Sequence, residues 1–412
     1  MHPDATPSRI LSPLRRDLDA FPLEQDGESF IVLRDPHGYS DRMMRLRPEA
    51  WALLMLMDGS RSAADLCAML RAEHRIDIAE ASVAELARAL ADNLLLDDDR
   101  FRARRQEVED AWRALPIREA VHAGASYDDD PDALDGFLRA HMTANHGEIP
   151  REAPVGVITP HIDLQVGPAV YVPAIRALGN AEFDTVVLLG TSHYSDEDTF
   201  ILTSKHYRTP LGVCHTDTEL VARIRERSGD VFTRNDIAHR PEHSIEFPVL
   251  FLQHAFADRT FRIVPVLCTS MEQHLHAGTS PREDQRYRTF IDAVQGAIGD
   301  LGRRVVYLMS VDWSHIGRKF GDERDACDML AEVRASDQAQ LEALARGDHA
   351  GFERLLRAHG NATRIDGYAC ITTFFDLTHP AHGRLLAYEQ WHEEERASGV
   401  TFAAMSFYSG SA

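Results

Sequence analysis

The stretch VVYLMSVDWSHIG, residues 305–317, decides which fold class this chain belongs to. Its first five residues are apolar or aromatic, a pattern typical of a strand that is buried on both faces. Asp312 follows three residues after Met309, and His315 comes three residues later. Titratable side chains directly after a buried strand are expected in parallel α/β sheets, where ligands bind beyond the carboxyl ends of the strands.

The same design recurs earlier in the chain. Continuous apolar runs predict strands within residues 154–161 (PVGVITPH), 183–193 (FDTVVLLGTSH) and 261–268 (FRIVPVLC), and residues 166–178 (VGPAVYVPAIRAL) predict a helix between the first two. Parallel strands need such crossover connections. We therefore predict an α/β domain over residues 153–412, with a mostly parallel sheet covered by helices on both faces.

Residues 22–102 predict a small separate domain. Short alternating runs such as FIVLRD (residues 30–35) are typical of strands, three short helices follow, and LLLDD (residues 94–98) predicts a closing strand. This order of elements favours a winged-helix-like module. Residues 1–21 are then an N-terminal tail, and residues 103–152, a polar helix followed by an acidic, turn-rich stretch, are a linker.

Charge and cysteine usage limit the partners and the compartment. The formal net charge of −21 disfavours long-range attraction to nucleic acid or to anionic membranes. The five cysteines show no CxxC spacing, and no signal-like apolar run opens the sequence, which predicts a reducing cytoplasm. No stretch approaches the ~18 consecutive apolar residues of a membrane helix, so no membrane partner is expected.

Histidines stand at the ends of three predicted strands. His161, His193 and His315, the last accompanied by Asp312, would lie along one rim of a parallel sheet. A single histidine of this kind is more often a structural residue. Three at equivalent positions favour a functional site.

Two further segments add candidate ligands or acid–base groups. In RPEHSIEFPVLFLQ, His243 and Glu246 have the i, i+3 spacing that places side chains on one face of a helix. The alternative is a capped helix in which these two side chains hydrogen-bond to each other. In DGYACITTFFDL, Cys370 stands where a helix begins, and a helix N-terminus depresses the pKa of a thiol. The alternative there is a buried, unreactive cysteine.

These residue types together predict a metal site. Two or three neutral imidazoles with one thiolate or carboxylate suit a first-row transition metal, and sulfur favours iron, zinc or copper over magnesium or calcium. Asp312, Glu246 and any histidine that is not a ligand would then orient the ligands or transfer protons.

Several of these segments, in their order and rough spacing, resemble the MEMO family, also called AmmeMemoRadiSam system protein B. The resemblance covers about residues 153–411 and implies a fold related to the class III extradiol dioxygenases, with a metal pocket at one edge of the sheet. The motifs that carry it are TPHIDLQVGP (159–168), LGTSHY (189–194), EHSIEFPVLFLQ (242–253), RIVPVL (262–267), SVDWSHIG (310–317) and DGYAC (366–370).

The resemblance implies a ligand set. His161, His193 and Cys370 would hold the metal, with the cysteine where the dioxygenases have a glutamate. This chain has Ile162 and Asp163 after the Pro-His pair where the family usually has PHAG, so Asp163 offers a further carboxylate ligand.

The resemblance also implies residues that line the pocket. Asp312 and His315 would face the metal, with His315 in the place of the dioxygenases' catalytic histidine. His243 and Glu246 match the family's EHSxE motif. We therefore take these four residues as the candidate catalytic groups.

The N-terminal part resembles the small PqqD-like domains that bind peptides beside radical enzymes. The similar stretches are DGSRSAADLCAML (58–70) and LADNLLLDDDRF (90–101). The resemblance implies a peptide or a radical enzyme as partner of this domain. The alternatives are a packing domain and a DNA-type winged helix, and the acidic charge argues against DNA.

Three functions follow from these residues. The first is a metal-binding protein that carries Fe(II), with copper or zinc as alternatives, for redox or dioxygenase-like chemistry on a small molecule or peptide. The second is a non-enzymatic module that binds a peptide or protein. The third is a zinc-dependent hydrolase in which Asp312 or His315 serves as the base.

Overall fold

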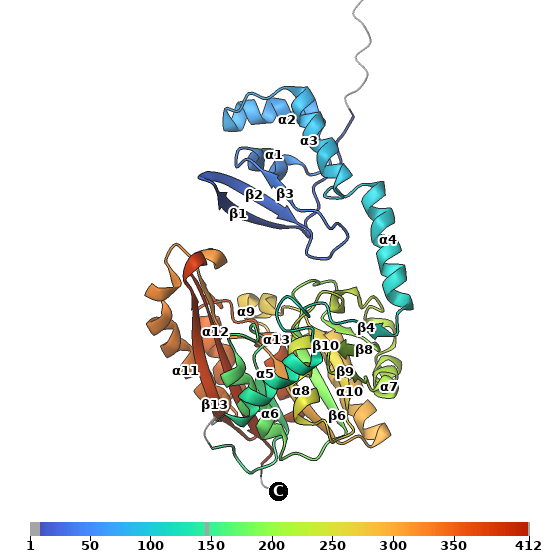
Figure 1. Ribbon diagram of the computed structural model, residues 1–412, viewed down its shortest axis with the longest axis vertical. Helices are drawn as coiled ribbons and strands as arrows, with labels where there is room; N and C mark the ends of the chain where they lie inside the picture. The colour runs from blue at the N-terminus through green and yellow to red at the C-terminus, as the bar shows by residue number, and fades with distance from the viewer. Residues whose placement is uncertain (1–8, 145–147, 411–412) are drawn as a thin grey trace, which may run out of the picture. The chain divides into compact units, whose positions relative to one another are not determined.

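The computed structural model describes residues 9–144 and 148–410, and the chain divides into two compact units between Ala114 and Leu115 (Figure 1). Residues 1–8 of the predicted tail and 145–147 of the predicted linker lie outside the described residues. The first unit includes the helix that the sequence assigns to the linker. The second begins before the predicted α/β domain.

The first unit combines a small antiparallel sheet with helices. The sheet has the order β1-β2-β3, and Leu33 of this sheet shares a buried core with Leu53, Leu66 and Leu90 of the helices. Ser62 caps its helix through the backbone N–H of Asp65, as its position predicts. The elements are β1 (Asp19–Gln25), β2 (Glu28–Arg34), β3 (Met44–Leu46), α1 (Ala50–Leu56), α2 (Ala63–Met69), η1 (Leu70–His74), α3 (Glu80–Asp92) and α4 (Asp99–Ala114).

The predicted closing strand of this unit is wrong. Within residues 94–98, Leu96 forms only an isolated bridge with Leu14. The partner segment contains Pro13, which has no N–H to donate to a ladder. The pairing therefore does not extend into a strand.

The second unit is built on an eight-stranded sheet. Its order is β12-β14-β5-β11-β6-β10-β7, with β13 on the other side of β14. The α/β fold is confirmed: β5, β11, β6 and β10 run parallel, and antiparallel strands extend the sheet at both edges. The strands are β5 (Gly156–Thr159), β6 (Thr185–Thr191), β7 (Phe200–Leu202), β10 (Arg262–Cys268), β11 (Val305–Ser310), β12 (His315–Gly317), β13 (His382–Glu393) and β14 (Ser398–Tyr408).

Helices cover both faces of this sheet, because the central strands are apolar on both sides. In β6, Val187 and Leu189 join one buried core, and Val186 and Leu188 join another. The first core contains α7 (Thr218–Ser228), α10 (Gln285–Leu301), α11 (Leu330–Ala345), α12 (His349–Ala358) and α13 (Tyr368–Thr378). The second contains α5 (Pro131–Thr143), α6 (Pro168–Leu178) and α8 (Glu246–Ala255).

The remaining elements connect or flank these layers. β4 (Ile117–Arg118) pairs with β8 (His206–Thr209), which pairs with β9 (Gly212–Cys214). α9 (Glu272–Ala277) and several short turns of 3₁₀-helix lie between the longer elements. No helix in the described part of the chain is both long enough and apolar enough to span a bilayer.

Candidate metal centre

Three imidazoles meet at the carboxyl ends of neighbouring parallel strands. His161 follows β5, His193 follows β6, and both strands pair with β11, so their ends lie on the same edge of the sheet. His243 comes from the turn that precedes α8. One ring nitrogen of each histidine lies within 4.8 Å of the others. The structure thus brings together two predicted ligands and one predicted catalytic residue.

Each ring is oriented through its Nδ1 atom. Nδ1 of His161 lies 3.1 Å from the carbonyl oxygen of Ser310, and Nδ1 of His193 lies 2.9 Å from Oε1 of Glu242. Nδ1 of His243 lies 3.3 Å from the same carboxylate oxygen. An imidazole held in this way through one nitrogen presents the other to a metal, which is the usual arrangement of histidine ligands.

Glu242 organises two of the three histidines, and the sequence analysis missed it. Its carboxylate is fully buried and accepts hydrogen bonds from the backbone N–H groups of His193, His243 and Ser244. Burial alone would raise the pKa of Glu242, but the adjacent His193 outweighs it and lowers the pKa well below the ordinary value. The EHSIE motif contains two glutamates, and the i, i+3 rule selected the second.

Glu246, the selected glutamate, anchors another segment. It is the first residue of α8, is fully buried, and forms an ion pair with Arg118 and a hydrogen bond with Tyr127. The backbone N–H groups of Val121 and His122 also donate to it. Its partners therefore belong to the segment around β4, and the metal cluster does not include it.

Asp366 completes the cluster and is the second residue that the sequence analysis missed. Its Oδ2 atom lies 3.0 Å from Nε2 of His161 and 3.8 Å from Nε2 of His193. Burial opposes ionisation, but His161 and His193 outweigh it and lower the pKa of Asp366 below its ordinary value. Both carboxylate oxygens are buried, yet neither has a hydrogen-bond partner in the described structure.

A buried carboxylate is costly unless a cation neutralises it, and the contacts of Asp366 are ion pairs with two imidazoles. The oxygens of Asp366 adjoin two imidazoles whose Nε2 atoms point to the same place. These four side chains, three imidazoles and one carboxylate, fit a first-row transition-metal ion. The only sequence signal for Asp366 was its position directly before Gly367, at the start of α13.

Cys370 lies further along the same helix. It is fully buried, and its thiol contacts Cys268 and Thr191. Burial and the Cys268 thiol raise the pKa of Cys370 well above its ordinary value, opposite to the expected depression. In the described part of the chain, the cluster of mutually close imidazole nitrogens does not include this thiol.

Asp312 and His315 contact the backbone of segments that carry cluster residues. Oδ1 of Asp312 accepts from the backbone N–H groups of His161 and Ile162, at 3.0 and 3.1 Å, and burial raises the pKa of Asp312. Nδ1 of His315 lies 3.0 Å from the carbonyl oxygen of Arg364. His315 thus borders the loop that carries Asp366.

Asp163 forms hydrogen bonds within its own turn. Its Oδ1 accepts from the backbone N–H of Gln165 at 2.8 Å, and its carbonyl oxygen accepts from Val166 and Gly167. The extra carboxylate of the PHID sequence therefore has a structural role in the turn that leads to α6.

A cavity of about 230 Å³ opens beside Asp366. Its lining is mixed, with polar residues such as Thr191, Glu272 and Arg364 beside apolar ones such as Met271 and Ile365. The cavity therefore adjoins the histidine cluster through Asp366.

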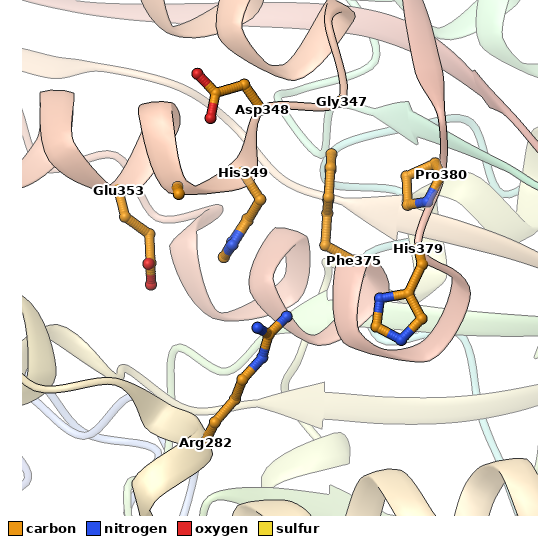
Figure 2. Close-up of a pocket in the computed structure, with 9 residues that line it drawn as sticks. Arg282, Gly347, Asp348, His349, Glu353, Phe375, His379 and Pro380 are labelled. Carbon is orange, nitrogen blue, oxygen red and sulfur yellow. The ribbon is translucent and has the colours of Figure 1, made fainter. Parts of the chain in front are cut away.

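A larger cavity, of about 330 Å³, lies among α12, α13 and the turn at Arg282 (Figure 2). Arg282 pairs there with Asp376, and His349 lies 3.1 Å from the hydroxyl of Thr372. Burial lowers the pKa of His349 to about 4, so the ring is uncharged at neutral pH.

Comparison with known proteins agrees with this architecture. The family model described as Memo-like protein matches residues 118–406. A MEMO1 family protein of Aquifex aeolicus (strain VF5) is 31% identical over 405 residues, which cover 94% of this chain and 98% of the relative. A MEMO1 family protein of Thermus thermophilus is 27% identical over 329 residues, covering 79% of this chain and 93% of the relative. The match confirms the resemblance seen in the sequence motifs, and the chain belongs to the Memo-like protein family.

Proposed function

We propose that this protein holds one Fe(II) ion through His161, His193, His243 and Asp366, and uses it for dioxygenase-like redox chemistry on a small molecule or peptide. The observation that carries the proposal is the buried carboxylate of Asp366, whose Oδ2 faces the Nε2 atoms of His161 and His193 at 3.0 and 3.8 Å. In this proposal Asp366 takes the place expected for Cys370.

The exchange of a thiolate for a carboxylate changes the expected metal chemistry. Two histidines and one carboxylate form the ligand set of non-haem Fe(II) oxygenases, which keep open positions for substrate and oxygen. His161, His193 and Asp366 supply that set here, and His243 adds a third imidazole, so a six-coordinate Fe(II) ion would keep two open positions. Bound Fe(II) would supply one-electron chemistry with dioxygen. The carboxylate of Glu242 accepts hydrogen bonds from the His193 ring and the His243 backbone, and Asp312 accepts one from the backbone N–H of His161. These two residues, which are not ligands themselves, therefore fix the positions of the histidine ligands.

His315 is the proposed proton-transfer group, next to the loop that carries Arg364 and Asp366. Its Nδ1–H donates to the carbonyl of Arg364, which leaves Nε2 free to accept or donate a proton. Arg364 also lines the cavity and pairs with Asp322. In this proposal the guanidinium group of Arg364 would bind a carboxylate or phenolate of the substrate.

A zinc-dependent hydrolase is the second candidate. The observation that favours it is the group of three imidazoles, because three histidines and a water are the ligands of some catalytic zinc sites. Asp366 or His315 would then act as the base toward that water.

Elemental analysis of protein purified anaerobically from unsupplemented cells tests the proposal. We expect near-stoichiometric iron in the parent and in Cys370→Ser, and loss of the iron in Asp366→Ala. Loss in Cys370→Ser with retention in Asp366→Ala would reverse the ligand assignment. Near-stoichiometric zinc in the parent would favour the hydrolase.

Nitric oxide then tests for open coordination positions. Anaerobic, iron-loaded protein should give the electron paramagnetic resonance signal of a nitric oxide complex of high-spin Fe(II), since nitric oxide is a surrogate for dioxygen. Iron-loaded protein that gives no such signal would contradict the oxygenase chemistry while leaving the metal assignment intact.

A further inference from the structure

A second group of possible metal ligands lies at the surface of the C-terminal unit. Ligand atoms of Asp325, Cys327 and His392 lie within 4.8 Å of one another. Cys327 belongs to a short 3₁₀ turn, Ala326–Asp328, and His392 is near the end of β13. Cys327 is exposed, and the side chains of Asp325 and His392 are about one third exposed, so an ion could enter directly from solvent.

The backbone holds these side chains in place. Ala326 is fully buried against Ile316 and Val333, and its N–H donates to the carbonyl of Ala397. Asp325 caps the turn by accepting from the N–H of Cys327 at 3.0 Å. The turn that carries two of the ligands is therefore anchored before any ion binds, which lowers the entropic cost of binding.

The carboxylate and the imidazole are already in contact. Oδ1 of Asp325 lies 3.1 Å from Nε2 of His392. A second carboxylate is close by, because Oδ1 of Asp328 lies 3.8 Å from Sγ of Cys327. One sulfur, one nitrogen and two carboxylates are thus available within a small region.

A cysteine, a histidine and an aspartate can also form a hydrolytic triad, but the surroundings of this thiol oppose that use. A nucleophilic cysteine needs an electropositive environment that favours the thiolate. The hydrogen bond and charge of Asp325, with the charge of Asp328, instead raise the pKa of Cys327. A divalent cation would neutralise the same carboxylates and stabilise the thiolate as a ligand.

We propose that Asp325, Cys327 and His392 form a second metal site, which takes Zn²⁺ or a similar borderline-soft divalent ion, with Asp328 as an additional oxygen ligand. Zn²⁺ accepts tetrahedral sets of sulfur, nitrogen and carboxylate oxygen. The exposure of the site makes it suited to an ion that exchanges with solvent. The site shares no residue with the cluster at His161, so it does not depend on the function proposed above.

Titration of the metal-free full-length protein with Co²⁺ tests the thiolate ligand. Thiolate-bound Co²⁺ gives a strong near-ultraviolet charge-transfer band, whereas nitrogen and oxygen ligands do not. We expect the band in the parent and in Cys370→Ser, and its loss in Cys327→Ser. A band that persists in Cys327→Ser, or no band in the parent, would overturn the proposal.

Alkylation of cysteine provides a second readout, which works with Zn²⁺ and needs no absorption band. Zn²⁺ should slow iodoacetamide labelling of Cys327 at least tenfold, and His392→Ala should abolish this protection. Cys67, the partly exposed cysteine of the N-terminal unit, is the internal control and should label at the same rate with and without Zn²⁺. Equal labelling of Cys327 with and without Zn²⁺, or full protection in His392→Ala, would contradict the site.

Discussion

Nε2 of His161 lies 3.0 Å from Oδ2 of Asp366, although the two residues come from opposite ends of the α/β unit. His161 follows β5, and Asp366 precedes α13, so only the folded sheet brings them together. Asp366 is in ion-pair contact with His161 and, at 3.8 Å, with His193, and these contacts hold its carboxylate beside both imidazoles. Buried imidazole and carboxylate groups that converge on one point are the ligand types of a transition-metal ion.

Glu242→Gln should weaken metal binding without removing a ligand. Glu242 orients His193 and His243 and supplies the negative charge that strengthens both as ligands. Loss of such an orienting carboxylate typically costs about 10–100-fold in metal affinity. Competition with a chromophoric chelator measures the change.

Asp163→Asn is the matched control for this variant. Asp163 also follows a sheet strand near the cluster, but its carboxylate accepts a hydrogen bond within its own turn. We expect the affinity of this variant to equal that of the parent. A similar loss in both variants would mean that general charge, and not orientation, sets the affinity.

Gly190→Ala should disturb the cluster through packing alone. A Cβ atom at Gly190 in β6 would lie 2.7 Å from Cδ1 of Ile245 and 2.7 Å from Oγ of Ser244. These residues follow His243, so the added methyl should displace that histidine. We expect a loss of about 1–3 kcal/mol in the free energy of unfolding, typical of overpacking, together with weaker metal binding.

Gly299→Ala in α10 is the control for the added methyl group. The space around a Cβ atom there is open, and alanine favours a helix over glycine. Thermal denaturation should show no loss of stability, and metal binding should be unchanged. Equal destabilisation by the two substitutions would contradict the close packing at Gly190.

The parts of the site carried by continuous apolar strands could be predicted from the sequence. His161 and His193 follow β5 and β6, and these strands formed where the apolar runs predicted them. Parallel pairing then placed both histidines at one edge, because it aligns the carboxyl ends of strands.

The parts carried by loops could not be predicted in the same way. Asp366, Glu242 and the turn position of His243 depend on where a loop crosses the sheet, and residue spacing does not encode that path. Cys370 was chosen for its position at the start of a helix and from the family resemblance, and neither of these gives the distance of its thiol from the histidines. The antiparallel hairpin of β13 and β14 is a local pairing, and it was not predicted.

Asp217 should make the stability of the C-terminal unit depend on pH. It caps α7 through the N–H of Leu220 and accepts a 2.8 Å hydrogen bond from Arg303. Burial opposes ionisation, but the bond from Arg303 outweighs it and lowers the pKa of Asp217 below the ordinary value of 3.8. A depressed folded-state pKa adds stability that is fully present above 3.8 and is lost as pH falls through the folded-state value.

Denaturation with urea at a series of pH values measures this effect. Asp217→Asn should have a lower free energy of unfolding than the parent at neutral pH, and the difference should shrink as the solution becomes acidic. A difference that stays constant down to the most acidic pH would show that helix capping alone, without the charge, accounts for the loss.

Arg118→Ala should be the most destabilising of these substitutions. Arg118 and Glu246 are both fully buried, and removal of one partner leaves an uncompensated buried charge, which costs about 3–5 kcal/mol. The exposed pair Arg208–Glu119 is the control, because exposed ion pairs contribute little. Denaturation with urea should give a much lower free energy of unfolding for Arg118→Ala than for Arg208→Ala.

Glu246→Gln tests whether this glutamate takes part in metal binding. Glu246 lies outside the histidine cluster, so Glu246→Gln protein that remains folded should bind metal like the parent. A loss of metal from folded Glu246→Gln would show that Glu246 participates directly in the site.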